Sequence, residues 1–272
     1  MKIIVILFFS MLLALPIYGQ NRETDYLSHV LEKMNAVESV TYHCVKKAWE
    51  PGDKEPVYSV PTEIYEHVNP QDTAVGYSFL CASDKEFRQP LWVYDGTVFA
   101  YIEKEEKEVR IDDFTQKSPL PFRVIMPQAF GCMKSILEYA LNTQDSIVLS
   151  LKDEGKDYLM ELSIHTPYQV EFFGKACYMP QNPYIYDPTS IYKIWISKEN
   201  DMPYRYRREM QHSISEDICS DFVYNPSGKG KIVAEDYYPA DYVRRIKGEK
   251  SQKATVDMTG KKAPDWTLTD MK

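Results

Sequence analysis

The chain has 272 residues, a formal net charge of −8 and 44% hydrophobic residues. This composition can bury a hydrophobic core, so the chain is not disordered as a whole. The acidic balance argues against a nucleic-acid-binding protein and against a polybasic membrane-surface protein, because both need a cationic surface. Aromatic residues reach 13%, with 21 Tyr, and this favours β-sheet, because flat rings suit a pleated, half-buried surface.

The N-terminus has the pattern of a secretory signal peptide. After the basic Lys2, residues 3–15 are apolar except for Ser10, and Pro16 ends the run. The run is shorter than the roughly 20 residues that a membrane helix needs and fits the apolar core of a signal peptide. We predict cleavage after Gly19, a signal peptide over residues 1–19 and export to the periplasm or cell envelope. The alternative is an uncleaved N-terminal anchor. No second long apolar run follows, so no transmembrane span is expected in the mature chain.

Five cysteines follow the predicted cleavage site, and they are Cys44, Cys81, Cys132, Cys177 and Cys219. An odd number leaves at least one cysteine without a partner in the chain. The two nearest in sequence are 37 positions apart, which excludes a Cys-x-x-Cys motif and a finger-type zinc site. We expect small buried side chains with, at most, one structural disulfide. The spacing does not fix which cysteines pair.

The mature chain is predicted to begin with an amphipathic helix. Leu27, Val30, Leu31 and Met34 recur at helical spacing and form one apolar stripe. Thr24 is expected to cap the helix, which should end near Ala36.

From Ser39 the hydrophobic period changes to two, which predicts a long succession of strands. Polar turns separate them, and Asp95-Gly96 is the strongest hairpin signal. The predicted strands cover residues 39–45, 57–68, 73–82, 91–94, 97–102, 109–112, 147–152, 158–165, 168–174, 192–197, 204–210 and 214–224, with weaker candidates at 231–238 and 242–246. A second helical pattern follows Pro127, and Phe130, Met133 and Leu137 belong to it.

These strands follow one another without a helix between each pair, which disfavours a parallel α/β sheet. Only one or two helices are available to cover the apolar face of so large a sheet. We therefore predict an α+β, mainly β fold, in which a large curved antiparallel sheet forms a half-barrel wrapped over one or two helices.

Two segments resemble the LolA-like superfamily of envelope lipoprotein carriers. Residues 92–101, WVYDGTVFAY, resemble that family's hairpin of an aromatic strand, Asp-Gly and a second aromatic strand. Residues 194–204, IWISKENDMPY, are similar to its strand-turn-strand pattern with a Pro after a polar turn. The resemblance covers a predicted domain of residues 20–248. It implies a half-barrel that binds a lipid or lipoprotein acyl chain.

The C-terminal residues carry a different resemblance. Residues 260–270, GKKAPDWTLTD, look like the opening of a secreted thioredoxin-like (TlpA/redoxin) domain. Residues 249–259 have the composition of a linker, and the sequence stops at Lys272 before any Trp-Cys-x-x-Cys. The resemblance implies a truncated thioredoxin-like domain over residues 260–272, whereas an ordinary polar tail is the alternative.

No catalytic, cofactor or metal motif is found in the sequence. It contains no His-Glu-x-x-His, no Gly-x-Ser-x-Gly, and residues 225–230 lack the P-loop spacing. Asp112 and Asp113 are adjacent on a strand and point to opposite faces, as do His43 and Cys44. We predict no catalytic residue, and thiol-disulfide oxidoreductase activity only if a Cys-x-x-Cys domain follows.

Two groups of side chains are candidates for binding a ligand or partner. Arg205 and Arg207 share one face of a strand, where an acidic partner or lipid head group could dock, although pairing with Glu209 and other acids is the simpler interpretation. Tyr178 and the two further tyrosines of the Pro-rich loop, Tyr184 and Tyr186, could form a contact rim. The remaining aromatic residues either fill the core or line an apolar cavity.

Three functions are compatible with these features. The function that we predict is a periplasmic accessory or binding module of a thiol-disulfide oxidoreductase, with catalysis lying beyond Lys272 and a redox protein as partner. The alternative is a stand-alone periplasmic carrier for lipid or lipoprotein acyl chains. A third and weaker hypothesis makes Cys177 a reactive thiol.

Overall fold

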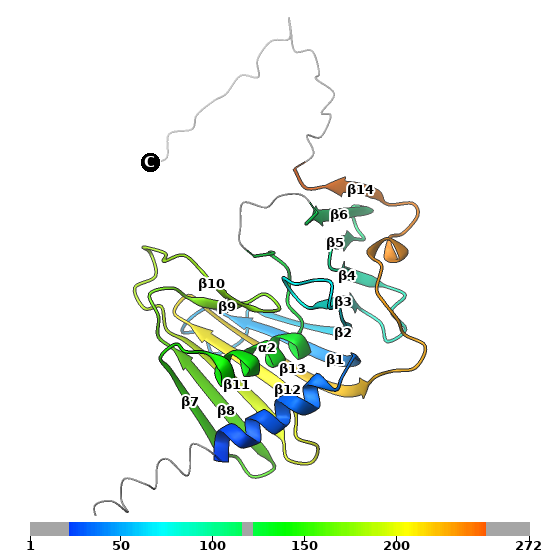
Figure 1. The fold of residues 1–272 in the computed structure, drawn as a ribbon. Helices are drawn as coiled ribbons and strands as arrows, with labels where there is room; N and C mark the ends of the chain where they lie inside the picture. Colours follow the sequence, from blue (N-terminus) through cyan, green and yellow to red (C-terminus); the bar gives the residue numbers. More distant parts are fainter. Residues whose placement is uncertain (1–21, 116–121, 249–272) are drawn as a thin grey trace, which may run out of the picture.

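The computed structural model describes residues 22–115 and 122–248 (Figure 1). The predicted signal peptide, linker and thioredoxin-like opening lie outside the described residues. In the described ranges, no helix combines the length and the apolar composition needed to cross a bilayer. These ranges contain two α-helices, one at residues 22–35 (the N-terminal helix) and α2 (Ala129–Asn142).

The strands follow one another along the chain, as predicted. Before α2 the structure contains β1 (Ser39–Trp49), β2 (Tyr58–Val68), β3 (Tyr77–Ala82), β4 (Pro90–Tyr94), β5 (Val98–Glu103) and β6 (Glu108–Asp113). After α2 come β7 (Ile147–Asp153), β8 (Asp157–Ile164), β9 (Val170–Phe172), β10 (Ala176–Tyr178), β11 (Ser190–Ser197), β12 (Met202–Met210), β13 (Ser213–Tyr224) and β14 (Val243–Ile246).

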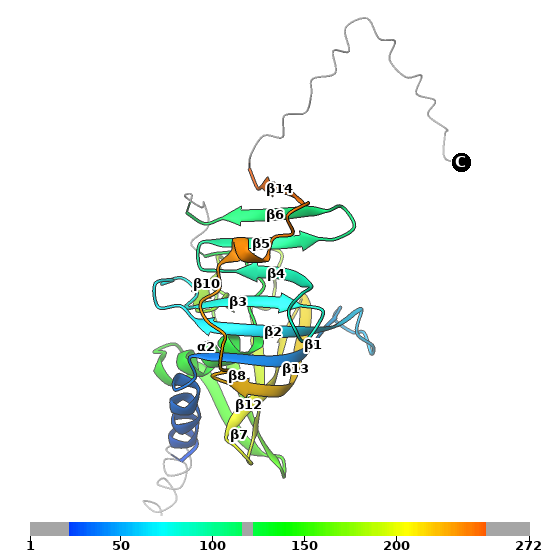
Figure 2. The ribbon, with the colours of Figure 1, turned by 90° about the vertical axis from the view of Figure 1, so that its right-hand side faces the viewer.

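Twelve of these strands form one open sheet in the order β14-β6-β5-β4-β3-β2-β1-β13-β12-β11-β8-β7. Every neighbouring pair is antiparallel except β14 and β6, which run parallel. The sheet twists and curves over the two helices (Figures 1 and 2). The predicted α+β, mainly β half-barrel is therefore confirmed in its general form.

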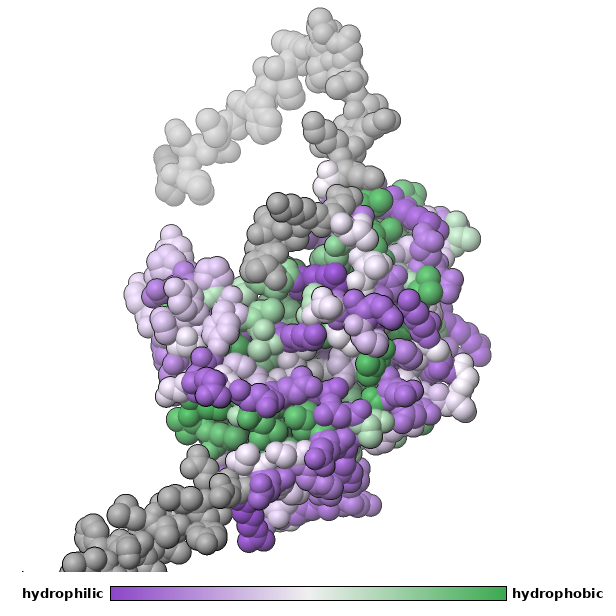
Figure 3. All heavy atoms as spheres, in the orientation of Figure 1, coloured by the Kyte–Doolittle hydropathy of each residue, from purple (hydrophilic) through white to green (hydrophobic). Residues whose placement is uncertain are grey.

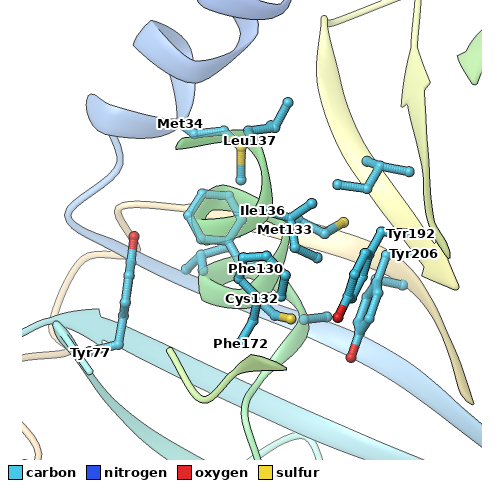
Figure 4. Close-up of a cluster of buried hydrophobic side chains, with 14 of the residues drawn as sticks. Met34, Tyr77, Phe130, Cys132, Met133, Ile136, Leu137, Phe172, Tyr192 and Tyr206 are labelled. Carbon is cyan, nitrogen blue, oxygen red and sulfur yellow. The ribbon is translucent and has the colours of Figure 1, made fainter. Parts of the chain in front are cut away.

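The two helices lie on one side of the sheet, called here the inner face. Leu27, Val30 and Met34 of the N-terminal helix are fully buried, as their helical spacing predicts. On α2, the buried residues contact the strands beneath, and Figure 4 shows Phe130 and Met133 among the aromatic rings of this core. The apolar stripe of each helix thus covers part of the inner face.

The opposite, outer face has its own smaller core. Buried side chains of β3 to β6 contact Ile232 and Ala234 there. Figure 2 looks onto this face and shows residues 225–242 (orange) crossing the strands. The predicted strand at 231–238 is wrong, because the segment lies across the sheet and forms the 3-10 helix η1 (Ala234–Tyr237). Ile232 and Ala234 face the core at a spacing of two without pairing as a strand.

Two further expectations are corrected. Thr24 does not cap the N-terminal helix, because residue 22 is already helical and Thr24 lies inside it. The strand predicted at 168–174 shortens to β9, which pairs only with β10 and forms a separate two-stranded sheet.

Candidate functional site

The helices cover the inner face unevenly. The N-terminal helix lies at the β8 end, where the ring of Tyr26 packs edge-on against Tyr158 with centroids 4.8 Å apart, and α2 contacts β9, β10 and β12. Neither helix reaches β5 and β6 at the other end of the sheet (Figure 1). Aromatic side chains there remain partly exposed, and Tyr101 is 40% exposed.

A hollow of about 460 Å³ lies at this uncovered end, between β5, β6 and β14. We call it the aromatic hollow, because Phe99 and Tyr101 form its floor. Its wall and rim are formed by Glu108, Arg110, Ile111, Asp112, Arg245, Ile246 and Lys247. The Tyr101 ring stacks on Trp92 at 5.9 Å with an interplanar angle of 7°, so the floor is supported from the next strand.

Strand register explains why these side chains meet. Phe99 is opposite Asp112 and Tyr101 is opposite Arg110 in the β5–β6 pair. Directly opposite residues of an antiparallel pair project from the same face. The parallel strand β14 then places Arg245 beside Arg110. The hollow therefore depends on a strand that follows β6 only after more than a hundred residues.

The cations of the rim are paired with carboxylates but remain exposed. Arg110 Nη2 is 2.8 Å from Glu103 Oε2, and Lys247 Nζ is 3.1 Å from Asp112 Oδ2. Arg245 forms an ion pair with Glu108. The three cationic side chains are 59–74% exposed, whereas the carboxylates that they pair with are only 12–23% exposed. The exposed ends of these cations can therefore attract an anionic ligand group alongside their present carboxylate partners.

A largely buried polar cluster forms around Arg123, next to β4. Arg123 Nη1 donates to Asp72 Oδ1 at 2.9 Å, to the Tyr94 hydroxyl at 2.5 Å and to the Gly96 carbonyl at 2.6 Å. Burial, and next the hydrogen bond with Asp72, raise the pKa of Tyr94. The guanidinium also lies over the Phe114 ring, 5.2 Å from its centroid. This cluster connects Arg123 and Phe114 to Tyr94 of β4.

A second apolar surface lies at the opposite end of the inner face. The half-buried Ile147, Leu149 and Leu151 of the edge strand β7 pack against the main core. Figure 3 shows a band of hydrophobic residues between the two helices in this region. The aromatic hollow combines partly exposed rings with cations at its rim, so it is the stronger candidate.

The residues predicted from the sequence as partner contacts do not converge on one site. Tyr184 and Tyr186 are 84% and 88% exposed in their loop, whereas the Tyr178 hydroxyl donates to Asp145. Arg205 and Arg207 project from the outer face, since the intervening Tyr206 is buried in the inner core.

Both arginines are paired with acids and stack on tryptophans. Arg205 forms an ion pair with Glu216 and lies 4.0 Å from the ring centroid of Trp195. Arg207 Nε donates to Glu209 Oε1 at 2.7 Å, as the simpler interpretation expected. Most of the aromatic surplus fills the core, and the largest fully buried rings are Tyr42, Tyr94, Tyr192, Phe79 and Phe130. The sequence analysis did not identify Phe99 and Tyr101 as site residues. Their positions two apart in a strand indicated only that both side chains point to the same face.

The described residues contain no group of three His, Cys, Asp or Glu side chains able to hold a metal ion. All five cysteines are free, and only Cys177 is more than marginally exposed. Partial burial raises the pKa of the Cys177 thiol, which lowers its thiolate fraction at neutral pH. Burial is thus the effect that acts on this thiol, and it makes Cys177 less reactive rather than more reactive.

The sequence matches no protein-family model and no curated protein. Several solved structures overlap with this chain at low sequence identity and low TM-score. A DUF1329 family protein from Desulfovibrio piger shares 12% identity over 82% of this chain and 98% of that chain, with a TM-score of 0.36. The lipoprotein LppX of Mycobacterium tuberculosis shares 9% over 77% and 97%, with a TM-score of 0.37. A LolA superfamily protein from Nitrosomonas europaea shares 10% over 79% and 98%, with a TM-score of 0.28. Overlaps at these scores establish neither a family nor a ligand for this chain.

Proposed function

We propose that the protein is a carrier of the cell envelope or periplasm that binds the acyl chain of a lipid or lipoprotein in the aromatic hollow. The observation that carries the proposal is the hollow of about 460 Å³ where the helices leave the inner face uncovered. Small-molecule sites are concave, mostly apolar and of roughly 300–1,000 Å³, with a few polar groups that orient the ligand. The hollow has these properties.

An amphiphile with an anionic head group fits the distribution of charge. The rings of Phe99 and Tyr101 offer apolar surface, and burial of each methylene of an acyl chain is favourable by about 0.8 kcal/mol. Arg110, Arg245 and Lys247 lie at the rim, where their exposed cationic groups can attract a carboxylate or phosphate. The apolar floor would thus hold the acyl chain of the amphiphile, and the cations at its edge would hold the head group.

A titration of the mature chain with a fluorescent fatty acid tests the proposal. We expect saturable binding by the delipidated wild type and at least tenfold weaker binding by Tyr101→Glu, because a charge would replace the floor of the hollow. Tyr168→Glu is the matched control, since Tyr168 is 53% exposed outside the hollow. No saturable uptake by the wild type, or equal losses in both variants, would refute acyl-chain binding in the hollow.

The exposed loop tyrosines extend this proposal to a partner. Tyr184 and Tyr186 project from the protein and are assigned to contact with the donor or acceptor of the acyl chain, since Tyr is enriched at interfaces. Replacing both by Ala should slow transfer of the fluorescent fatty acid to acceptor vesicles without changing its Kd. Arg205 and Arg207 stay predicted contacts for an acidic partner or lipid head group.

The role as accessory module of a thiol-disulfide oxidoreductase stays a prediction, because it depends on residues 260–272 outside the described ranges. The coding sequence after Lys272 tests it directly. A Cys-x-x-Cys within about fifty codons would support a redox protein as partner, and a stop codon would remove that role.

A further inference from the structure

Two buried cysteines face each other across the centre of the main sheet. Cys44 of β1 and Cys219 of β13 are direct partners in the antiparallel register, between the pairs Val45–Ile218 and His43–Ser220. Their side chains are in hydrogen-bond contact. Both are reduced in the structure.

The backbone geometry of this pair suits a disulfide. Directly opposite residues in an antiparallel ladder have Cα atoms about 4.5 or 5.5 Å apart, depending on the type of pair. Disulfides span Cα separations of about 4.4–6.8 Å. Either type of pair therefore permits the bond without moving the strands.

No other cysteine competes for either thiol. Cys81 lies on β3, which is separated from β1 by β2, so about 9–10 Å divides the two strands. Cys132 lies on α2, where its thiol contacts Tyr206, and Cys177 lies on β10 of the small sheet. The register thus fixes a pairing that sequence spacing left open.

We propose that Cys44 and Cys219 are joined by a disulfide in the oxidised form of the protein, which links β1 to β13 at the centre of the sheet. The inference is independent of acyl-chain binding. The oxidant is a disulfide, either of a small thiol such as glutathione or of a thiol-disulfide oxidoreductase.

Access favours Cys219 as the first thiol to react. Cys219 lines a hollow of about 330 Å³ together with Tyr204, Phe222 and Tyr224, whereas Cys44 is completely buried. The Cys219 thiolate attacks one sulfur of the oxidant, which forms a mixed disulfide and releases one thiol. The Cys44 thiolate then attacks the Cys219 sulfur and releases the second thiol. The two cysteines lose two electrons and two protons, and the oxidant disulfide is reduced to two thiols.

Burial raises the pKa of the Cys219 thiol well above its ordinary value, so exchange in the folded protein is slow. The test therefore refolds the reduced, denatured full chain in a mixture of reduced and oxidised glutathione. Free thiols are then alkylated and the protein is digested with trypsin without reduction. Cys44 lies in the peptide of residues 34–46 and Cys219 in that of residues 209–229, and neither contains another cysteine.

We expect these two peptides to be recovered joined, with Cys81, Cys132 and Cys177 alkylated. The oxidised wild type should melt roughly 10 °C above the reduced wild type, because the bond closes a loop of well over 100 residues. Cys44→Ala and Cys219→Ala should lose this difference, whereas Cys177→Ala should keep it. Alkylation of all five cysteines in natively refolded protein, or a different linked pair, would overturn the proposal. The peptide map of the wild type decides the question even if a variant fails to fold.

Discussion

The Tyr42 hydroxyl donates a hydrogen bond of 2.5 Å to Oε1 of Glu66, on the inner face beneath the start of α2. Glu66 also accepts the backbone N–H groups of Phe130 and Gly131, each at 3.0 Å. Gln128, at the N-cap position of α2, makes no side-chain cap. The sheet thus supplies a carboxylate to the helix N-terminus, where the helix dipole favours negative charge. Burial raises the pKa of Glu66, and the hydrogen bonds from Tyr42 and the helix oppose that rise.

Tyr42→Phe should lower the free energy of unfolding by about 1.5–3 kcal/mol, because it removes a buried hydrogen bond to a charged group. Urea denaturation measures the loss. A double-mutant cycle with Glu66→Gln should give a coupling energy above about 0.5 kcal/mol. Tyr184→Phe, at an exposed tyrosine, serves as control and should change stability by less than about 0.5 kcal/mol. Additivity of the two core substitutions would show that the contact contributes nothing.

Gly131→Ala should destabilise the protein although Ala is the better helix former by about 1 kcal/mol. A Cβ atom at this position would lie 2.9 Å from Glu66 Oε2 and 3.1 Å from the Tyr77 ring. We expect a net loss of about 1–3 kcal/mol from overpacking, measured by thermal unfolding. Gly230→Ala is the control, since its Cβ would meet open space. A more stable Gly131→Ala protein would mean that the carboxylate does not approach the helix so closely.

Arg123→Ala should cost about 3–5 kcal/mol, because it leaves the carboxylate of Asp72 buried without its charge partner. The Asp72 side chain is 1% exposed and that of Arg123 is 23% exposed. Chemical denaturation gives the value, and the exposed Arg88→Ala should lie within about 0.5 kcal/mol of the wild type. Equal stability of the two variants would contradict the role given to this cluster.

Asp95→Asn should make the free energy of unfolding less sensitive to a fall in pH than it is in the wild type. Burial disfavours the charged carboxyl, but hydrogen bonds from Thr97, Val98 and Ala234 outweigh it and lower the pKa of Asp95 below its ordinary value. A carboxyl group whose pKa is lower in the folded than in the unfolded protein stabilises the fold at pH values above its unfolded-state pKa. This stability is lost as the pH falls through its folded-state pKa. The variant should therefore be about 1–2 kcal/mol less stable at pH 7, with the difference shrinking below pH 4.

Unfolding of both proteins measured at several pH values checks this prediction, with the exposed Asp53→Asn as control. A difference between wild type and Asp95→Asn that is constant from pH 7 to pH 3 would show that the carboxylate charge plays no part in joining η1 to the β4–β5 hairpin.

Local patterns predicted most of the fold. Leu27, Val30 and Met34 identify a helix because a stripe at 3.6-residue spacing has one buried face, and Asp95-Gly96 identifies a hairpin because Gly96 adopts φ +97°. The fold class also followed from the order of the elements. These signals depend only on neighbours in sequence.

The parts that sequence reasoning missed depend on distant pairing. Ile232 and Ala234 alternate like a strand, but the outer core across β3 to β6 decides their conformation. The hollow exists because Arg245 pairs beside Arg110, and nothing near either residue predicts that register. The Cys44–Cys219 pairing likewise becomes visible only with the β1–β13 ladder.

The parallel strand β14 is only four residues long, at the edge of the sheet, and it contributes two of the groups lining the hollow. Occupancy of the hollow and attachment of this strand are therefore thermodynamically linked, and each must strengthen the other by the same factor. A ligand bound there would slow hydrogen exchange of the backbone amides from Val243 to Ile246, and a chain shortened before β14 would bind that ligand more weakly.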